Sequence, residues 1–482
     1  MILVTGATGY IGGRLIPKLV ARGERVRVLA RDPRRLGPLA SVAHEVVRGD
    51  VLQPDTLPAA LEGVETAYYL IHSMTTAHGD FAAADRLAAQ NFAAACGRAH
   101  VRRIVYLGGL GRDEGRLSTH LASRQEVGAV LRGGPTPVTE LRAAIIIGAG
   151  SASFEIIRDL AAKLPFMITP RWVRSRCEPI AVTQVLDYLV GVLDEPRTVD
   201  QVLEIGGGEV LTYADLLRGC ATALGRRIRM IPVPVLSPGL SAYWLNLVTA
   251  VPMSLARPLV EGLRNDAVTT DHRIREWLPV RNVPYREAVA AALAEDSSRG
   301  PVSRWTGADT SPAGELRPGG APLLVDEREV SCAANADVLF DVVQRVGGET
   351  GWYYADALWR ARGLVDRLLG GVGMRRGRPR GSALTVGQPV DFWRVEEAQR
   401  GRLLRLRAEM KLPGVARLEF RVRPAGSGAV LHQRASFQPR GVAGWLYWYG
   451  LKPAHLVIFR GMARALVRTA EREAVRSTPV LV

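Results

Sequence analysis

The sequence predicts two folded parts joined by a linker: a doubly wound α/β domain with a parallel sheet, then an α+β domain with an antiparallel sheet. Two observations predict the first part. Short apolar runs alternate with amphipathic helical stretches, and a glycine-rich turn follows the first apolar run. The second part is predicted by strands in which apolar and charged residues alternate, followed by a long amphipathic stretch.

The α/β part is predicted from the order of its elements. Strands buried in a parallel sheet are short runs rich in apolar residues, and here a helical pattern separates most of these runs. The expected strands are 2–5, 25–30, 44–48, 66–70, 103–107, 138–142 and 202–205. The expected helices include 11–21, 56–61, 81–99 and 118–132. The region 143–295 carries fewer strands, as a substrate-binding subdomain would, so the first domain is expected to span 1–295.

A linker is predicted over residues 296–322, where Ser, Gly, Pro and Thr predominate. In the domain that follows, 323–482, two stretches alternate apolar with charged residues: 403–412 and 417–423. This alternation is typical of antiparallel strands with one buried face.

The second domain is expected to end in a helix from residue 454 to about 473. Its apolar residues fall on one stripe, with Arg460, Arg464 and Arg468 on the opposite side. A curved antiparallel sheet closed by one long helix is an architecture that encloses apolar cavities.

Charge and cysteine content limit the partners. Lys and Arg number 63 against 47 Asp and Glu, a net charge of +16. The arginines form no dense block interleaved with aromatic residues, so no nucleic acid partner is expected. Anionic phospholipid headgroups or a phosphorylated cofactor fit this charge better. The four cysteines show no CxxC spacing, which predicts neither a disulfide framework nor a metal site.

The distribution of apolar residues predicts a cytoplasmic protein. The chain starts directly with a strand-like run, so we expect no secretory signal. The long uncharged run 230–256 contains several prolines and poorly suits a membrane-spanning helix. Peripheral contact with the inner face of a membrane is the alternative. Contact with a membrane is also one interpretation of the aromatic run 444–450, GWLYWYG. The other interpretation is that these rings pack at the rim of the domain's cavity. The sequence indicates no particular oligomeric state.

A glycine-rich turn predicts a dinucleotide site. The segment VTGATGYIGGRL follows the first strand and leads into a helix. Its glycines allow a tight turn and the close approach of a pyrophosphate to the helix N-terminus, where backbone N–H groups are unpaired. This context predicts a Rossmann-type fold. The expected cofactor-binding residues of the turn are Thr5, Gly6, Thr8, Gly9, Tyr10, Ile11 and Gly12.

The ends of the next two strands predict which dinucleotide binds. Arg31 stands at the position that reads the adenosine ribose, and with Arg34 or Arg35 nearby it suits a 2′-phosphate. NADP is therefore the expected cofactor and NAD the alternative, with a solvated surface arginine as the other interpretation of Arg31. Asp50 and Val51 are expected to flank the adenine.

Several segments together resemble a known family. In the first part these are TGATGYIG, ARD, GDV, YYLIHSM, NFAAACGRAHVRRIVYLGGLG, GAGSASFEIIRDL, LPFMITPRWV and PIAV. They are similar to the atypical short-chain dehydrogenase/reductases, on the branch of the NmrA-like proteins and the complex I 39 kDa subunit. The second part, with FWRVEE, ARLEFRV and FQPRGVAGWLYWYGLKPAHLVIFRGM, resembles the DUF2867 domain. That domain is classed here with the helix-grip (START/SRPBCC-like) folds. The resemblance implies an apolar ligand in a central cavity.

The chain departs from the catalytic pattern of that family. Typical members use a serine, a tyrosine and a lysine four residues after the tyrosine; here Gly108 and Gly109 stand at the serine, with His120 and Arg124 at the other two positions. Arg124 can bind ribose hydroxyls and His120 can exchange a proton. A cation one helical turn away is expected to lower the pKa of His120. The alternative is that both residues only contact the cofactor or cap the helix.

Two further donors, His72 and Ser73, end the fourth strand, and His72 is expected to contact the cofactor rather than to catalyse. The sequence thus predicts an NAD(P)H-dependent oxidoreductase for a hydrophobic, quinone-like or lipid-like substrate, held with the help of the second domain. The alternative is a non-catalytic protein: a dinucleotide-dependent sensor, or a lipid or quinone carrier or assembly protein.

Overall fold

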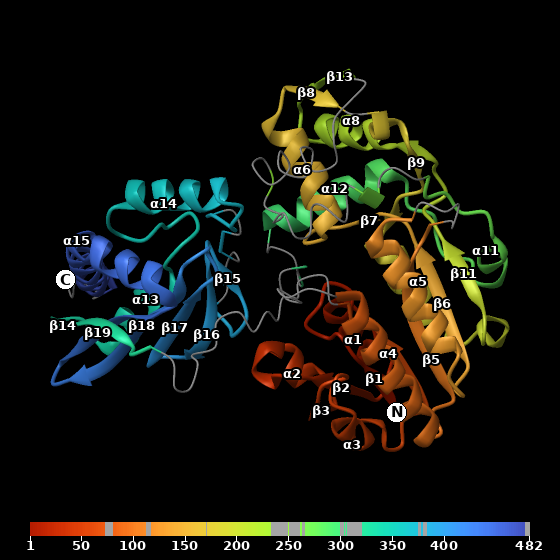
Figure 1. The fold of residues 1–482 in the computed structure, drawn as a ribbon, viewed down its shortest axis with the longest axis horizontal. Helices are drawn as coiled ribbons and strands as arrows, with labels where there is room; N and C mark the ends of the chain where they lie inside the picture. The colour runs from red at the N-terminus through yellow and green to blue at the C-terminus, as the bar shows by residue number, and fades with distance from the viewer. Residues whose placement is uncertain are drawn as a thin grey trace, which may run out of the picture. The chain divides into compact units, whose positions relative to one another are not determined.

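The computed structural model divides the chain into two compact units, Met1–Thr310 and Ser311–Val482 (Figure 1). The first unit is α/β and the second α+β, which confirms the fold class predicted for each. The structure describes residues 1–72, 81–111, 117–169, 171–232, 249, 261–262, 266–298, 303, 305, 321–374, 377–378 and 383–477.

A seven-stranded parallel sheet forms the centre of the first unit. The strands lie in the order β11 (Val202–Ile205), β6 (Val138–Ala143), β5 (Arg103–Gly109), β4 (Thr66–Tyr69), β1 (Ile2–Val4), β2 (Val26–Ala30) and β3 (Glu45–Arg48). All neighbours are parallel. The order reverses between β1 and β4, as in a doubly wound sheet. Each strand lies within two residues of its predicted bounds.

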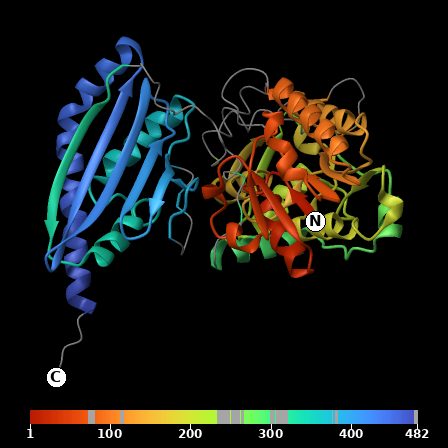
Figure 2. The ribbon, with the colours of Figure 1, turned by 90° about the horizontal axis from the view of Figure 1, so that it is seen from below.

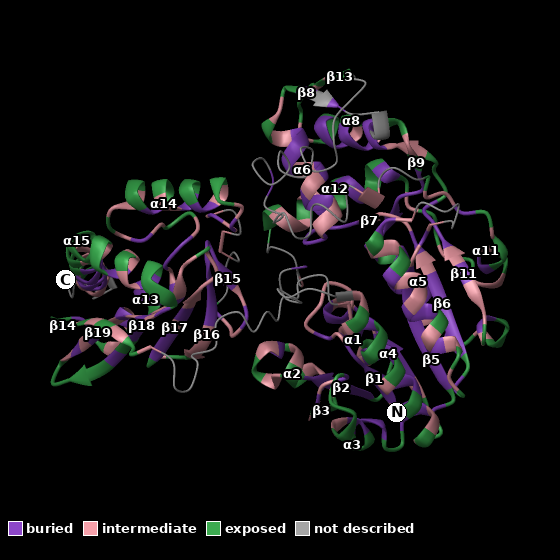
Figure 3. Cartoon of the chain, viewed as in Figure 1, coloured by how far each residue is buried: buried purple, intermediate pink, exposed green. Residues whose placement is uncertain are grey.

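Helices cover both faces of this sheet, and its strands are buried between them except for the edge strand β3, whose Glu45 and Arg48 are exposed (Figure 3). Successive residues of a strand point to opposite faces: in β1, Val4 joins one apolar layer and Leu3 the other. The first layer contains residues of α1 (Gly12–Ala21) and α7 (Val182–Gly191). The second contains residues of α3 (Leu57–Leu61), α4 (Phe81–Arg98) and α5 (Thr119–Arg132).

The chain after β6 builds the predicted subdomain from short elements around a third apolar cluster. Two-stranded sheets pair β7 (Ile146–Ile147) with β10 (Ile180–Ala181), β8 (Phe166–Thr169) with β13 (Arg229–Pro232), and β9 (Arg176–Cys177) with β12 (Leu211–Thr212). The helices are α6 (Ala152–Lys163), α8 (Tyr213–Ala223), α11 (Arg273–Trp277) and α12 (Tyr285–Ser298). Further short helical turns of the unit are α2 (Leu39–Val42), η1 (Pro33–Leu36), η2 (Pro54–Thr56), η3 (Arg171–Arg174) and η4 (Pro196–Thr198).

Two described residues of the segment predicted as a linker pack against the first unit. Trp305 belongs to the third apolar cluster, and its indole Nε1 donates to Glu155 Oε2 at 2.6 Å. The hydroxyl of Ser303 donates to the carbonyl oxygen of Tyr10 at 2.6 Å. The first unit therefore gains part of its core from beyond residue 295.

The second unit is a six-stranded antiparallel sheet covered by helices. The strand order is β14 (Leu324–Cys332), β19 (Gly428–Pro439), β18 (Gly414–Ala425), β17 (Leu403–Ala408), β16 (Trp393–Gln399) and β15 (Pro389–Val390). Its helices are α13 (Ala336–Gln344), α14 (Asp356–Leu368) and α15 (Gly441–Ser477). Helix α15 runs along the sheet and packs against β14 and β19 (Figure 2).

Helix α15 begins 13 residues before the predicted start at 454. Pro453 lies inside the helix, and the apolar stripe that predicted the helix begins only after it. The turns before Pro453 are stabilised by packing that the stripe does not show. The ring of Trp448 stacks on Phe437 of β19, with centroids 5.8 Å apart. Tertiary contact thus extends the helix across a proline that cannot donate a backbone hydrogen bond.

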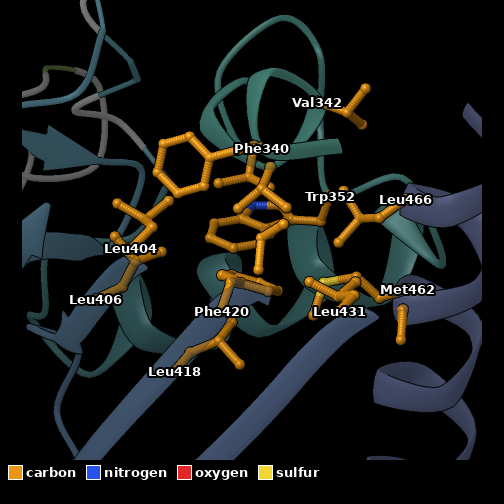
Figure 4. Packing of buried hydrophobic residues seen from close by; sticks show 14 of the residues in the cluster. Phe340, Val342, Trp352, Leu404, Leu406, Leu418, Phe420, Leu431, Met462 and Leu466 are labelled. Atoms are coloured by element: carbon orange, nitrogen blue, oxygen red, sulfur yellow. The ribbon is translucent and has the colours of Figure 1, made fainter. Parts of the chain in front are cut away.

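Side chains occupy the space between the sheet and the helices of the second unit (Figure 4). Trp352 is fully buried at its centre, and its indole N–H donates to Asp391 Oδ2 at 2.9 Å. The rings of Trp359, Phe392 and Trp393 lie 5.3, 6.3 and 6.0 Å from that of Trp352. Aromatic side chains thus fill the part of the interior where the resemblance implied a ligand. Binding in a central cavity remains a prediction.

Candidate functional site

A cleft of about 500 Å³ lies at the carboxyl ends of the parallel strands in the first unit. Ligands of doubly wound sheets bind at this edge, where the strand order reverses. The cleft is lined by most of the predicted cofactor residues: Gly6, Thr8, Gly9, Tyr10, Ile11, Gly12, Arg31, Asp50, Val51, His72 and Arg124. His120, predicted as a catalytic residue, also lines it. One edge of the sheet therefore brings these predicted groups together.

The glycine turn leaves room for a phosphate group because two of its glycines have no space for a side chain. Gly6 has a φ of +68°, and a Cβ on it would lie 2.4 Å from the carbonyl oxygen of Leu70. A Cβ on Gly12 would lie 2.4 Å from the carbonyl oxygen of Gly6. Helix α1 starts at Gly12, so the positive end of its dipole lies directly after this turn. The geometry fits the pyrophosphate of a dinucleotide.

Thr5 and Arg34 do not line the cleft, unlike the other predicted cofactor residues. Thr5 is buried, and its hydroxyl donates to the carbonyl oxygen of Tyr68 at 2.9 Å, so it ties β1 to β4. Arg34 forms a two-point ion pair with Asp32, at 2.9 and 2.8 Å. Arg35, the alternative to Arg34, does line the cleft.

The Arg34–Asp32 pair bears on cofactor choice. The guanidinium of Arg34 holds the pKa of Asp32 below its ordinary value, chiefly through their hydrogen bonds. A carboxylate at this end of the second strand otherwise favours a ribose 2′-hydroxyl. Here the Asp32 carboxylate is paired with Arg34, and its neighbours in sequence Arg31 and Arg35 line the cleft.

The turn after β3 is held in place by hydrogen bonds from two sides. The Asp50 carboxylate accepts from the backbone N–H of Leu52 at 3.0 Å, and the carbonyl of Val51 accepts from Asn91 Nδ2 at 2.9 Å. Asp50 and Val51 therefore keep a fixed position at the adenine end predicted for them.

His72 and His120 meet in the cleft, at 2.8 Å between their Nε2 atoms. His72 follows β4, and His120 lies in the first turn of α5, which Ser118 caps. On its other side, His72 Nδ1 lies 3.2 Å from Oδ2 of Asp85, a buried residue of α4. Three elements thus form one chain of polar groups, Asp85–His72–His120, which ends at the cleft.

The sequence hypothesis missed Asp85. The available signal was weak: Asp85 is the only acidic residue in the alanine-rich helix α4. A single carboxylate on such a helix is usually solvated, and this one is 2% exposed.

Burial lowers the pKa of both histidines. For His120 the causes are burial, then His72, then Arg124, and together they place its pKa well below the ordinary value. The predicted effect of Arg124 is confirmed in direction, although burial is the larger cause. Burial also lowers the pKa of His72, while the hydrogen bond to Asp85 opposes this. Both rings are therefore neutral at pH 7.

The neutral state of both rings restricts where protons lie along the series Asp85–His72–His120. A His72 that donates from Nδ1 to the Asp85 carboxylate keeps a lone pair on Nε2. His120 must then donate from its own Nε2, which leaves a lone pair on its Nδ1. This arrangement can take a proton from a hydroxyl group bound in the cleft.

A side chain at the position of the family's serine would press on Leu121 and contact Arg124. A Cβ on Gly109 would lie 2.9 Å from Cδ2 of Leu121 and 3.5 Å from Cδ of Arg124. The Arg124 guanidinium donates to the carbonyl oxygen of Leu107 and lies 5.7 Å from the ring centre of Tyr106. Of the side chains at the family's three catalytic positions, His120 is the one that can exchange a proton, and it lies beside His72.

Ser73, the other donor predicted at the end of the fourth strand, lies outside the described residues. Ser153, which carries a hydroxyl group, also lines the cleft. In the part of the chain that the structure describes, no helix is long and apolar enough to cross a membrane.

Comparisons with known proteins agree with this division of the chain. A model of an NAD(P)H-binding family matches residues 6–142, and the model of DUF2867, a protein family of unknown function, matches residues 320–462. A ceramide reductase of Caulobacter vibrioides is 29% identical over 248 residues, half of this chain and 75% of that protein. The (4-alkanoyl-5-oxo-2,5-dihydrofuran-3-yl)methyl phosphate reductase of Streptomyces griseus is 30% identical over 237 residues, 48% of this chain and 76% of that protein.

Among solved structures, the triphenylmethane reductase of Citrobacter sp. in complex with NADP(H) has the same fold as the first unit. The TM-score is 0.50 at 21% identity, over 60% of this chain and 99% of that chain.

Proposed function

We propose, from the premise that this chain belongs to the NAD(P)H-binding reductase- and epimerase-like family and carries a C-terminal DUF2867 domain, that it is an NADPH-dependent oxidoreductase. Its reaction would interconvert a carbonyl and an alcohol on an apolar, lipid-like or quinone-like substrate. The observation that carries the proposal is the Asp85–His72–His120 chain, which opens into the cofactor cleft.

The cofactor would be held by groups at three places in the cleft. The glycine turn and the start of α1 would bind the pyrophosphate, and Asp50 with Val51 would flank the adenine. Arg31 and Arg35 would bind the 2′-phosphate, since the nearby carboxylate of Asp32 is paired with Arg34. Bound NADPH would supply the hydride for reduction of a carbonyl carbon.

The proton would come through His120. For carbonyl reduction these groups, neutral at rest, would first take up one proton from solvent, which His72 would hold as an imidazolium paired to the Asp85 carboxylate. The Nε2–H of His72 then donates to Nε2 of His120, and His120 carries its own proton on Nδ1. As the substrate oxygen gains charge, His120 gives up the Nδ1 proton and takes the Nε2 proton of His72. His72 is left neutral, still donating from Nδ1 to Asp85. Alcohol oxidation runs the same transfers in reverse.

The apolar substrate is supported by the lining of the cleft beyond His120. Aliphatic side chains form this part: Leu110, Leu121, Ile145, Ile146, Ile156 and Ile157. One relative is named for its action on ceramide, a lipid. The second unit would bring the enzyme to the lipid phase in which such a substrate dissolves.

The experiment that tests this function is turnover of NADPH in the presence of long-chain ketones and quinones. We expect the absorbance of NADPH to fall with at least one of these acceptors in the wild type. This activity should be lost in His120→Gln. The matched control is Glu126→Gln, because Glu126 is a partly exposed residue of the same helix and pairs with Arg86.

The second candidate function, a non-catalytic sensor or carrier, is favoured by the loss of the serine, tyrosine and lysine of the family pattern. It predicts tight binding of the dinucleotide and no turnover with any acceptor. That outcome, with the same affinity in His120→Gln, would contradict the oxidoreductase proposal.

A further inference from the structure

Helix α14 turns its apolar face to solvent. Leu358, Leu364, Val365 and Leu368 recur at helical spacing, and each is between 49% and 54% exposed. Leu369, which follows the helix, is 59% exposed. The outer side of α14 is coloured as exposed in Figure 3. An amphipathic helix normally buries such a face, so this exposure needs a physical cause.

The cause is the opposite face, which anchors α14 through Trp359 and Asp366. The carboxylate of Asp366 is fully buried and accepts hydrogen bonds from the backbone N–H groups of Gly373 at 2.8 Å and Lys411 at 2.7 Å. Turning the helix over would remove these bonds from a buried charge and would expose the ring of Trp359. The fold therefore fixes the leucines on the outside.

Helix α15 carries a second exposed apolar stripe. The buried ring of Trp359 in α14 lies 6.1 Å from the buried ring of Phe459 in α15, so the two helices meet in the interior of the unit. Exposed apolar side chains form one stripe along the first turns of α15, each between 52% and 74% exposed: Val442, Leu446, Tyr449, Leu456 and Val457. We call the exposed apolar residues of α14 and of this stripe the apolar surface.

The charges around the apolar surface are cationic. The second unit contains 27 Lys and Arg against 16 Asp and Glu, a net charge of +11 out of +16 for the chain. No acidic residue occurs between Arg440 and Glu471, over most of α15. The exposed cations nearest in sequence to the apolar residues are Arg360, Arg440, Lys452 and Arg460, and Lys411 Nζ donates to the carbonyl oxygen of Leu369 at 2.8 Å. The acidic residues of α14 are turned to backbone N–H donors: Asp366 as above, and Asp356 to Trp352.

We propose that the apolar surface docks the protein on an anionic phospholipid bilayer. Leucine and aromatic side chains would enter the boundary between headgroups and acyl chains, while the arginine and lysine heads bind lipid phosphates. The cationic surroundings favour this occupant over a second copy of the chain, because two equally cationic surfaces would repel each other. The contact is peripheral and does not depend on the proposed oxidoreductase activity.

The test is sedimentation of the full-length protein with vesicles of phosphatidylcholine alone or of phosphatidylcholine and phosphatidylglycerol in equal parts. We expect binding to the anionic vesicles that weakens as salt is added, and at least tenfold weaker binding to the neutral ones. The double variant Leu364→Glu/Leu368→Glu should weaken binding to anionic vesicles by at least tenfold. The matched control is Val210→Glu/Val475→Glu, which adds the same charge at exposed apolar positions outside the apolar surface.

Three results would overturn the proposal. These are no binding to anionic vesicles, equal loss of binding in both double variants, and a salt-independent dimer of the wild type that only Leu364→Glu/Leu368→Glu dissociates. The last would assign the surface to a second copy of the chain. Thermal unfolding of each variant shows that it is folded. Since α14 buries Trp359 and Asp366 rather than the substituted leucines, we expect unchanged transitions.

Discussion

The first unit places its unusual residues inside, and the second unit places them outside. The first unit holds polar groups, Asp85, His72 and His120, within a cleft. The second fills its interior with aromatic rings around Trp352 and leaves leucines of α14 outside. Folding alone would favour neither arrangement, because buried polar groups and exposed apolar faces both cost free energy. The difference assigns chemistry to the interior of one unit and attachment to the exterior of the other.

The largest expected effect tests the chemistry of the first unit. We expect His120→Gln to lower kcat by about 10²- to 10⁴-fold, the usual contribution of a positioned proton donor. Asp85→Asn should lower it less, because Asp85 acts through His72. Steady-state kinetics with NADPH and the best acceptor measures both. An unchanged kcat in His120→Gln would mean that protons reach the substrate by another route.

The next effect tests the filled interior of the second unit. Trp352→Ala should destabilise that unit by about 3–5 kcal/mol, since it removes a buried indole and leaves a cavity. Trp352→Phe keeps a ring and loses the bond to Asp391, with an expected cost of about 1–3 kcal/mol. Calorimetry should show the loss in one transition, because the cluster around Trp352 contains residues of the second unit only. A smaller effect of Trp352→Ala than of Trp352→Phe would contradict this packing.

A smaller effect sharpens the choice of cofactor. Arg31→Ala should weaken NADPH binding about tenfold or more, the value of one charge-assisted hydrogen bond, and leave NADH binding nearly unchanged. Arg48→Ala serves as the control, because Arg48 is exposed and does not line the cleft. Titration of cofactor fluorescence measures each affinity. Equal losses for NADPH and NADH in Arg31→Ala would remove the 2′-phosphate assignment.

The smallest effect concerns pH. Both histidines have a pKa in the folded chain below the ordinary value of about 6.5, so the unfolded chain binds more protons as the pH falls. Their contribution to stability is complete above about pH 6.5 and is lost below it, by up to about 1.4 kcal/mol per pH unit for each group. Thermal unfolding of the first unit between pH 7.5 and 5 should show this slope, and His120→Gln should reduce it. An unchanged slope in that variant would show that His120 titrates normally.

Much of the fold was predictable from local pattern. The seven strands of the first sheet and the glycine turn follow from apolar runs and glycine spacing, which act over a few residues. The two-stranded sheets of the subdomain and helix α14 were not predicted. Their strands are two to four residues long, too short to show a period, and α14 lies in a stretch whose apolar face gave no sign of its orientation.

The sequence by itself determined the dinucleotide fold, the cationic charge and the candidates His72, His120 and Arg31. Only the tertiary structure decided that Asp85 joins the two histidines, because three elements far apart along the chain must pack before these side chains meet. It also decided that Arg34 turns to Asp32 and that α14 faces outward. A periodic pattern fixes which residues share a face of a helix. Which face turns inward depends on partners, such as the backbone donors of Asp366, that only the folded chain provides.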